Sequence, residues 1–84
     1  MYFFYVLQSL STNNLYKGIS NNIDRRLAEH NKNKNPGTRG KGPWKVLYFE
    51  LHKDLKSARN REKFFKSGMG RELLKQFINI NNPL

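Results

Sequence analysis

The spacing of apolar residues changes along the chain and separates strands from helices. Residues 2–8 are aromatic and β-branched, and 15–19 form a second such run after the polar stretch 9–14, so the two predict a β-hairpin. A third strand is expected over 44–51, where the continuous run VLYF favours burial on both faces. Between these strands, residues 31–43 carry no large apolar side chain and several glycines and prolines, which is typical of a loop.

Polar capping residues mark where two helices begin. Asn21 and Asn22 can both accept hydrogen bonds from the free backbone N–H groups of a first turn, and a helix is expected from there to about His30. Asp54 offers the same kind of cap to a second helix, which is expected to reach Lys66. The two caps thus predict where the two helices begin, and the loop over 31–43 separates the first helix from the third strand.

The C-terminal part is expected to hold one more helix. A glycine-rich break at 68–70 precedes a helix over 71–78, and 79–84 is interpreted as a fraying tail. No repeat or linker divides the sequence, so residues 1–84 are expected to form a single domain. The predicted class is α+β, with a small three-stranded, mainly antiparallel sheet flanked by about three helices in the order β-β-α-β-α-α.

The charge of the chain indicates a polyanionic partner. Sixteen Lys and Arg residues against six Asp and Glu give a formal net charge of +10 in 84 residues, and such an excess most often serves nucleic-acid binding. The absence of cysteine excludes disulfides and thiolate metal sites. The apolar start of the chain lacks the features of a signal peptide and no segment is long enough to span a membrane, so a cytoplasmic protein without membrane contact is expected.

The first helix places its two adjacent arginines in different surroundings. With Ile23 at 0°, Leu27 lies at about 40° and completes the buried stripe, whereas Arg26 lies at about 300° and Arg25 at about 200°. Arg26 is therefore expected against the domain and Arg25 in solvent, with His30 one turn after Arg26. A snorkelling arginine and a histidine at a helix C-terminus are the ordinary alternatives.

The second helix carries an acid on its apolar side. With Ala58 at 0°, Leu55 lies at about 60°, Phe65 at about 340° and Glu62 at about 40°, in the middle of the predicted apolar face. Burying an unpaired carboxylate costs several kcal/mol, so Glu62 should have a cationic partner or a metal ion. The alternative is a buried salt bridge, for which Arg26 is one candidate. Caps, first turns, a strand end and an outward position explain the other acids: Asp24, Glu29, Glu50, Asp54 and Glu72.

Two tyrosines and a glycine share the predicted hairpin. Strand alternation places Tyr5 on one face with Phe3 and Leu7, and Tyr16 on one face with Gly18. A glycine inside a strand weakens packing unless a ligand or another group must come close. Tyr5 and Tyr16 are therefore either core aromatics with hydroxyls at the edge or members of a site.

These residues, taken in register, resemble the GIY-YIG nuclease superfamily. The likeness rests on Tyr5, on Tyr16-Lys17-Gly18 after ten intervening residues, on Arg26 and His30 four apart, and on Glu62 in a later helix. It covers residues 2 to about 77 and is closest to the small single-domain members, which are related to the N-terminal nuclease domain of the bacterial excision-repair incision subunit. The segments TRGKGPW and SARNREKFFK are also similar to those members. The first triad, Phe3-Phe4-Tyr5, lacks the usual glycine and isoleucine, and Lys17 replaces an isoleucine.

The resemblance implies a metal-dependent endonuclease that hydrolyses phosphodiester bonds in DNA. By that likeness, Glu62 holds one divalent ion, Mg²⁺ or Mn²⁺, and Arg26 contacts the scissile phosphate. Tyr5 and Tyr16 flank the attacking water, with the choice of general base open, and His30 bonds a tyrosine or the phosphate. Structure-specific cleavage linked to repair or recombination is the corresponding expectation.

Basic residues outside this set are candidates for contacts with the nucleic-acid backbone. They are Lys17, Arg39, Lys41, Arg59, Lys63 and Lys66. A solvated surface explains each of them as well as a contact does, and RNA is an alternative substrate. Specificity would come from DNA shape or from a partner protein. The main alternative function is a nucleic-acid-binding module on the same fold that does not cut, and a small scaffold protein is a third.

Overall fold

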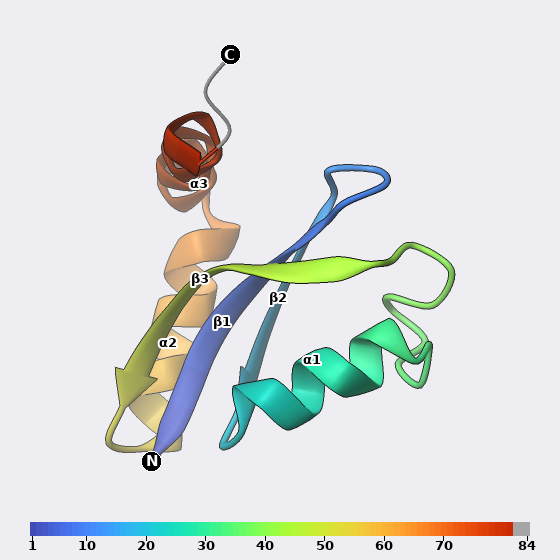
Figure 1. Cartoon of the computed structure of the whole chain (residues 1–84). Helices are drawn as coiled ribbons and strands as arrows, with labels where there is room; N and C mark the ends of the chain where they lie inside the picture. The colour runs from blue at the N-terminus through green and yellow to red at the C-terminus, as the bar shows by residue number, and fades with distance from the viewer. Residues whose placement is uncertain (82–84) are drawn as a thin grey trace.

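The structure is a computed structural model that describes residues 1–81 (Figure 1). Its elements are β1 (Tyr2–Ser9), β2 (Leu15–Ser20), α1 (Ile23–Asn31), β3 (Trp44–His52), α2 (Leu55–Lys66) and α3 (Gly68–Asn81). The three strands form one antiparallel sheet in the order β2-β1-β3. The predicted α+β class and the order β-β-α-β-α-α are therefore confirmed.

The central strand β1 sends alternate side chains to two different layers. Phe4 and Val6 pack with Phe65 of α2 and Leu74 of α3, and the rings of Phe4 and Phe65 are stacked with centroids 5.2 Å apart. The opposite face of β1, which includes Tyr5, packs against α1. Helix α1 thus covers one face of the sheet, and α2 and α3 cover the other (Figure 1).

Both helices that were expected to begin at polar caps do so. Asn22 Oδ1 accepts from the backbone N–H of Arg25 at 3.0 Å, and Asp54 Oδ1 accepts from that of Ser57 at 2.8 Å. Each bond satisfies one of the donors that a first helical turn leaves free. The caps fix where α1 and α2 leave the sheet, and hence which faces they cover.

The third strand is less buried than its sequence suggested. Phe49 and Leu51 are 56% and 52% exposed, so the expectation of burial on both faces of β3 is wrong. The reason is topological, because β3 lies at an edge of the sheet and α1 packs over its other end, near Trp44 and Val46. A register shift opposite Val6 and Leu7 also changes the alternation within the strand.

The junction between the last two helices is tighter than expected. Helix α3 begins at Gly68, and only Ser67, in an extended conformation, separates it from α2. Gly70 is needed for close packing, because a Cβ atom there would overlap the carbonyl of Phe64. The predicted break at 68–70 is therefore wrong. The helix continues through Asn81, beyond the end expected at 78. The fraying expected of 79–84 stays a prediction, and residues 82–84 lie outside the described part of the chain.

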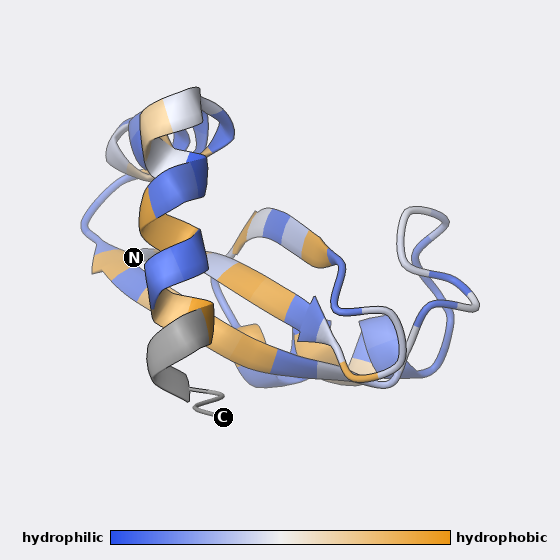
Figure 2. Ribbon diagram, turned by 90° about the horizontal axis from the view of Figure 1, so that it is seen from above, coloured by the Kyte–Doolittle hydropathy of each residue, from blue (hydrophilic) through white to orange (hydrophobic). Residues whose placement is uncertain are grey.

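Hydrophobic residues concentrate on the strands and on one side of α3, whereas the loop over residues 31–43 is mostly polar (Figure 2). None of the helices in residues 1–81 has the length and apolarity that crossing a membrane requires. The polar loop extends from the end of α1, next to the face of the sheet that carries Tyr5 (Figure 1).

Candidate active site

Tyr5 and Gly18 face each other across the hairpin. The two residues are register partners of β1 and β2. A Cβ atom at position 18 would lie 2.5 Å from the hydroxyl oxygen of Tyr5 and 2.6 Å from its Cζ. Only glycine leaves room for the phenol ring at this point, so the close approach expected of Gly18 is present, and the group that approaches is Tyr5 itself.

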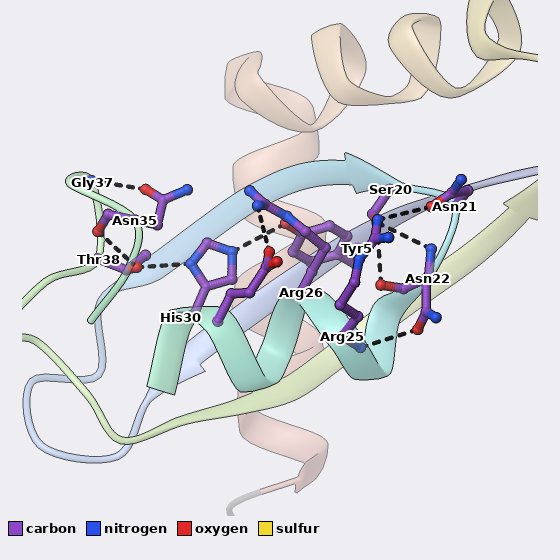
Figure 3. Close-up of polar contacts among 11 residues, drawn as sticks. Tyr5, Ser20, Asn21, Asn22, Arg25, Arg26, His30, Asn35, Gly37 and Thr38 are labelled. Carbon is purple, nitrogen blue, oxygen red and sulfur yellow. Dashed lines mark hydrogen bonds and ion pairs between the residues drawn. The ribbon is translucent and has the colours of Figure 1, made fainter. Parts of the chain in front are cut away.

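A chain of hydrogen bonds passes from α1 through the tyrosine to the loop (Figure 3). The hydroxyl of Tyr5 lies 3.2 Å from Nε2 of His30, and Nδ1 of His30 lies 2.7 Å from Oγ1 of Thr38. Thr38 donates onward to the carbonyl of Asn35 at 3.4 Å. The guanidinium of Arg26 lies beside the Tyr5 hydroxyl and acts to lower the pKa of its phenol.

The chemistry of arginine sets the direction of this chain. A guanidinium carries no acceptor, so the Tyr5 hydroxyl, with Arg26 beside it, donates to Nε2 of His30. The imidazole then carries its proton on Nδ1 and donates it to Thr38. Every donor in the chain finds an acceptor in this arrangement, which assigns the neutral Nδ1–H tautomer to His30.

Burial keeps both members of the central pair in their neutral forms. Tyr5 is 1% exposed, and desolvation raises the pKa of its phenol although Arg26 acts in the opposite direction. His30 is fully buried, and desolvation, aided by the charge of Arg26, lowers the pKa of its imidazole. At neutral pH, Tyr5 is therefore a phenol and His30 an uncharged acceptor.

The two arginines of α1 differ as expected. Arg25 is exposed and bonds Asn21 at 3.1 Å, whereas Arg26 is half-buried against Tyr5. Arg26 also forms an ion pair with Glu29, with NH1 2.8 Å from Oε1. Glu29 was expected to face outward and is instead half-buried, because its side chain folds back one turn toward the guanidinium.

Tyr16 lies beside this chain and is more accessible than Tyr5. Its ring centroid is 4.7 Å from that of His30 and 6.5 Å from that of Tyr5, and its side chain is half-buried. Gly37 of the loop lies near the ring of Tyr16. Tyr5, Tyr16, Gly18, Arg26 and His30, all singled out in the sequence, are thus brought together over β1 and β2.

Thr38 belongs to the site but was not singled out in the sequence. It is fully buried, it bonds His30, and its carbonyl accepts from the indole N–H of Trp44 at 3.3 Å. The segment TRGKGPW begins at this threonine, but a polar loop gives no periodic signal that one of its members is buried. Only the fold shows that the loop returns to His30.

Glu62 lies at the border of the buried face of α2, and not at its centre as expected. Its side chain is 27% exposed and Oε2 lies 3.5 Å from Nζ of Lys66. Arg61 takes a place on the other side of the stripe, with its guanidinium 5.0 Å and 4.8 Å from the ring centroids of Phe64 and Phe65. Arg61 and Glu62 thus border the buried stripe on opposite sides, and both side chains are partly exposed.

The acid with the strongest pairing is Glu50, which the sequence suggested only as a strand end. It accepts two bonds from Arg61, at 2.8 Å and 2.6 Å, and further bonds from Tyr48 and His52. These donors, Arg61 above all, lower the pKa of Glu50 to about 2. Its register pairing with Phe4 places it on the α2 face, a position that strand alternation from Tyr48 would have indicated.

The remaining basic candidates lie at the surface. Five of the six are exposed, and Lys17 is half-buried. Burial lowers the pKa of Lys17, and the nearby charges of Arg71 and Lys66 act in the same direction. Lys17, Lys66 and Arg71 therefore gather cations from β2, α2 and α3 on the α2 side of the sheet, where Lys66 also pairs with Glu62.

The donor set fits a metal ion that takes few protein ligands. Within residues 1–81, no three His, Asp or Glu side chains group together as a metal centre. Glu50 has both oxygens engaged by Arg61, whereas Glu62 is accessible and has one long ion pair. Mg²⁺ commonly binds one or two carboxylates and completes its shell with water and substrate phosphate, so Glu62 fits such an ion.

The sequence matches a known family over most of its length. A model of the GIY-YIG catalytic domain matches residues 1–74. The chain belongs to the GIY-YIG family. This family is a nuclease superfamily that acts on nucleic acids and generally uses a divalent metal ion, and the resemblance drawn from the spaced tyrosines, arginine, histidine and glutamate is confirmed.

Similar GIY-YIG proteins are of comparable size. A UPF0213 protein of Clostridium perfringens is 36% identical over 67 residues, which cover 79% of this chain and 71% of that protein. A UPF0213 protein of Bacillus cereus is 31% identical over 81 residues, 95% of this chain and 82% of that protein. The solution NMR structure of a UPF0213 protein from Bacillus halodurans has a TM-score of 0.53 and 26% identity, and the match covers 90% of this chain and 84% of that one.

Proposed function

We propose that the protein is an endonuclease that uses a divalent metal ion to hydrolyse phosphodiester bonds in DNA. The observation that carries the proposal is the cluster of Tyr5, Tyr16, Arg26 and His30 around Gly18, in which one buried phenol bonds an uncharged histidine and lies beside a guanidinium. A basic surface and membership of a nuclease superfamily support a nucleic acid as the substrate. Structure-specific cleavage linked to repair or recombination is part of the proposal.

The two tyrosines have different roles in this proposal. A general base must reach the water that it activates, and Tyr5 is nearly inaccessible, whereas Tyr16 is half-buried at the open side of His30. Tyr16 therefore contacts the attacking water. Tyr5 is a positioning residue that fixes Arg26 on one side and His30 on the other.

Arg26 contacts the scissile phosphate. Its guanidinium is pre-oriented by Tyr5 and Glu29, and a phosphate oxygen would take the place of the Glu29 carboxylate. The phosphorus gains negative charge on its oxygens as water attacks, so a fixed cation stabilises the transition state where that charge develops. Glu62 would hold the Mg²⁺ or Mn²⁺ ion, which supplies further positive charge to the same oxygens when bound.

The basic candidates would hold the nucleic-acid backbone outside the site. Lys17, Lys66 and Arg71 form one group of neighbouring cations. A bound phosphate would relieve the electrostatic repulsion among them. The exposed residues Arg39 and Lys41 of the loop, and Arg59 and Lys63 of α2, extend this surface. Together these cations explain a net charge of +10 on so short a chain.

Cleavage of plasmid, single-stranded and branched DNA with Mg²⁺ or Mn²⁺ tests the proposal. Arg26→Ala should lower the rate by about 100-fold or more, the order expected when a transition-state donor is lost. Glu62→Ala should abolish cleavage and largely retain DNA binding. Arg25→Ala and Glu72→Ala, exposed residues of the same types, are the matched controls and should cut like wild type.

Robust cleavage by Glu62→Ala would disprove the metal-ligand role of this residue. The alternative function, a binding module that does not cut, predicts a different result for wild type itself. In that case no substrate would be cleaved with either metal, while binding would remain tight and fall steeply with salt. RNA oligonucleotides of the same sequence establish whether the substrate class is restricted to DNA.

A further inference from the structure

A cavity of about 450 Å³ lies at the tip of α1, outside the set of residues given catalytic roles above. Its lining comes from β1 and β3, on the face of the sheet that α1 covers, and from the start of that helix with the two residues before it: Phe3, Asn21, Asn22, Ile23, Asp24, Val46 and Phe49. Sites for small aromatic or apolar groups have volumes of this order and combine an apolar wall with a few polar groups. The cavity therefore has the size and chemistry of a binding site.

The apolar wall contains an aromatic pair that is open to solvent. The rings of Phe3 and Phe49 meet edge to face, with centroids 5.9 Å apart and planes at 63°. In this geometry, part of the ring faces of the two phenylalanines stays uncovered by the other ring. Phe49 is 56% exposed on a chain that carries a net charge of +10, so an apolar surface of this kind needs an occupant.

The cavity adjoins the proposed active site. Phe3 and Tyr5 project from the same face of β1, about 7 Å apart along the strand. Tyr5 is the register partner of Phe49 in β3, and Phe3 is the register partner of Ser20 in β2. Figure 3 shows Asn21 and Asn22 at one end of the group that contains Tyr5 and Arg26, with His30 at the other end.

We propose that this cavity binds an unpaired nucleobase of the nucleic-acid strand whose phosphate contacts Arg26. The inference rests on the proposed nuclease function and adds the preferred form of the substrate. Stacking on a phenylalanine requires a base that is not already stacked in a duplex, and it is tolerant of sequence because every base has an aromatic face. The protein should therefore favour single-stranded regions, flaps or frayed ends over continuous duplex.

The polar rim and the charge of the chain favour a base over an apolar peptide. Asn21, Asn22 and Asp24 line the cavity with amide and carboxylate groups, which can bond the polar edge of a base. A second copy of this chain would bring ten further positive charges to the same surface, which opposes self-association there.

Binding to oligonucleotides that carry 2-aminopurine tests the inference without cleavage. Wild type, Phe49→Ala, Phe49→Trp and Leu51→Ala are compared in EDTA on a single strand and on the matching duplex. Leu51 is the matched control, since it is 52% exposed on the same strand but does not line the cavity. Stacking on one aromatic side chain contributes roughly 1–3 kcal/mol, so Phe49→Ala should weaken single-strand binding by about 5- to 100-fold.

Support requires a specific pattern across the variants. Binding of Phe49→Ala should no longer change the fluorescence of the aminopurine, and the affinity of this variant for the single strand should fall. Its affinity for the duplex should change less than about threefold. Phe49→Trp should retain both, and Leu51→Ala should behave as wild type. Circular dichroism spectra that match wild type show that each variant is folded.

Three results would overturn the inference. One is an equal loss of affinity by Phe49→Ala for the single strand and for the duplex. Another is an equal loss of single-strand affinity by Phe49→Ala and by Leu51→Ala. The third is a wild-type dimer in sedimentation that Phe49→Ala dissociates, which would assign the cavity to a second copy of the chain. Because these measurements need no cleavage, they are separate from the metal-dependent assays, whose failure would count against the nuclease function alone.

Discussion

On the α2 face of the sheet, Glu50 is enclosed by donors from three side chains and bridges β3 to Arg61 of α2. On the α1 face, Arg26 is half-buried, and its two partners, Tyr5 and Glu29, leave it within reach of solvent. Both are buried polar clusters with a guanidinium beside an aromatic ring. They differ in whether a further ligand can enter.

This difference separates structural from chemical use of the same residue types. A charge whose bonds are all satisfied fixes the helix that carries it and offers nothing to a substrate. A charge held in place by groups that can be displaced is ready to bind an anion. The Glu50 cluster is therefore expected to affect stability and the Arg26 cluster to affect chemistry, and the following predictions test that division.

The largest effect is expected for Gly18→Ala. The added methyl group would lie 2.5 Å from the Tyr5 hydroxyl oxygen, so the phenol must move and release Arg26 and His30. The cleavage rate should fall by about 100-fold or more, and overpacking should cost about 1–3 kcal/mol of stability. Rate assays and urea unfolding measure the two effects.

Gly68→Ala is the control for a methyl group added elsewhere. No atom lies within 4 Å of a Cβ at that position, and α3 begins there, so stability should stay equal or rise slightly. Normal cleavage by Gly18→Ala would show that the site does not depend on the position of Tyr5.

Glu50→Gln should lower stability and spare the chemistry. The amide cannot accept both bonds from Arg61 and leaves a guanidinium without its partner, which should cost about 2–3 kcal/mol. In a domain of this size that corresponds to a fall in Tm on the order of 10 °C or more. Below its Tm, the variant should cleave DNA at a rate within about twofold of wild type.

Glu72→Gln is the matched control for this substitution. Glu72 forms an exposed pair with Lys75 at 3.0 Å, and such pairs contribute less than about 1 kcal/mol. A loss of cleavage in folded Glu50→Gln, greater than its loss of stability explains, would show that the Glu50 cluster also takes part in chemistry.

The dependence of stability on pH should identify the same carboxyl. Its pKa is lowered from 4.5 to about 2 in the folded state, so Glu50 contributes its full stabilisation above pH 4.5 and loses it as the pH falls toward 2. The contribution is on the order of 3 kcal/mol. Urea unfolding of wild type and Glu50→Gln between pH 2 and 6 should give free energies that converge at the acid end, and parallel curves would contradict the assignment.

The smallest effect is expected for Thr38→Val. Valine keeps the shape but cannot accept the Nδ1–H of His30, which should cost about 1 kcal/mol and leave the imidazole less firmly oriented. Cleavage should slow by several-fold. The acid side of the profile of cleavage rate against pH should also shift, because the environment of His30 changes. Thr38→Ser, which keeps the hydroxyl, should retain the wild-type pH profile.

The elements and most of the site were predictable because their signals are local. Helical periodicity distinguished Arg26 from Arg25, and a glycine in a strand indicated the close approach at position 18. The surroundings of Thr38 and Glu50 were not predictable in the same way. Each depends on a segment that returns from elsewhere in the chain, the loop to His30 in one case and α2 to β3 in the other.

The position of Glu62 shows the limit of a helical wheel. Its place beside the apolar residues was predicted, but the wheel could not show that the side chain stays 27% exposed and pairs with Lys66. Similarly, the continuous apolar run of β3 indicated burial, yet the strand order placed it at an edge with Phe49 exposed. Periodicity gives the direction of a side chain, and the tertiary fold decides what lies in that direction.

The ion pair between Arg26 and Glu29 has a consequence for turnover. A phosphate that takes the NH1 donors of the guanidinium displaces a carboxylate 2.8 Å away, and the same carboxylate can return when the phosphate leaves. Glu29 is thus an intramolecular competitor for these donors. In the proposed nuclease, this competition would speed the release of a cleaved end and weaken the capture of substrate.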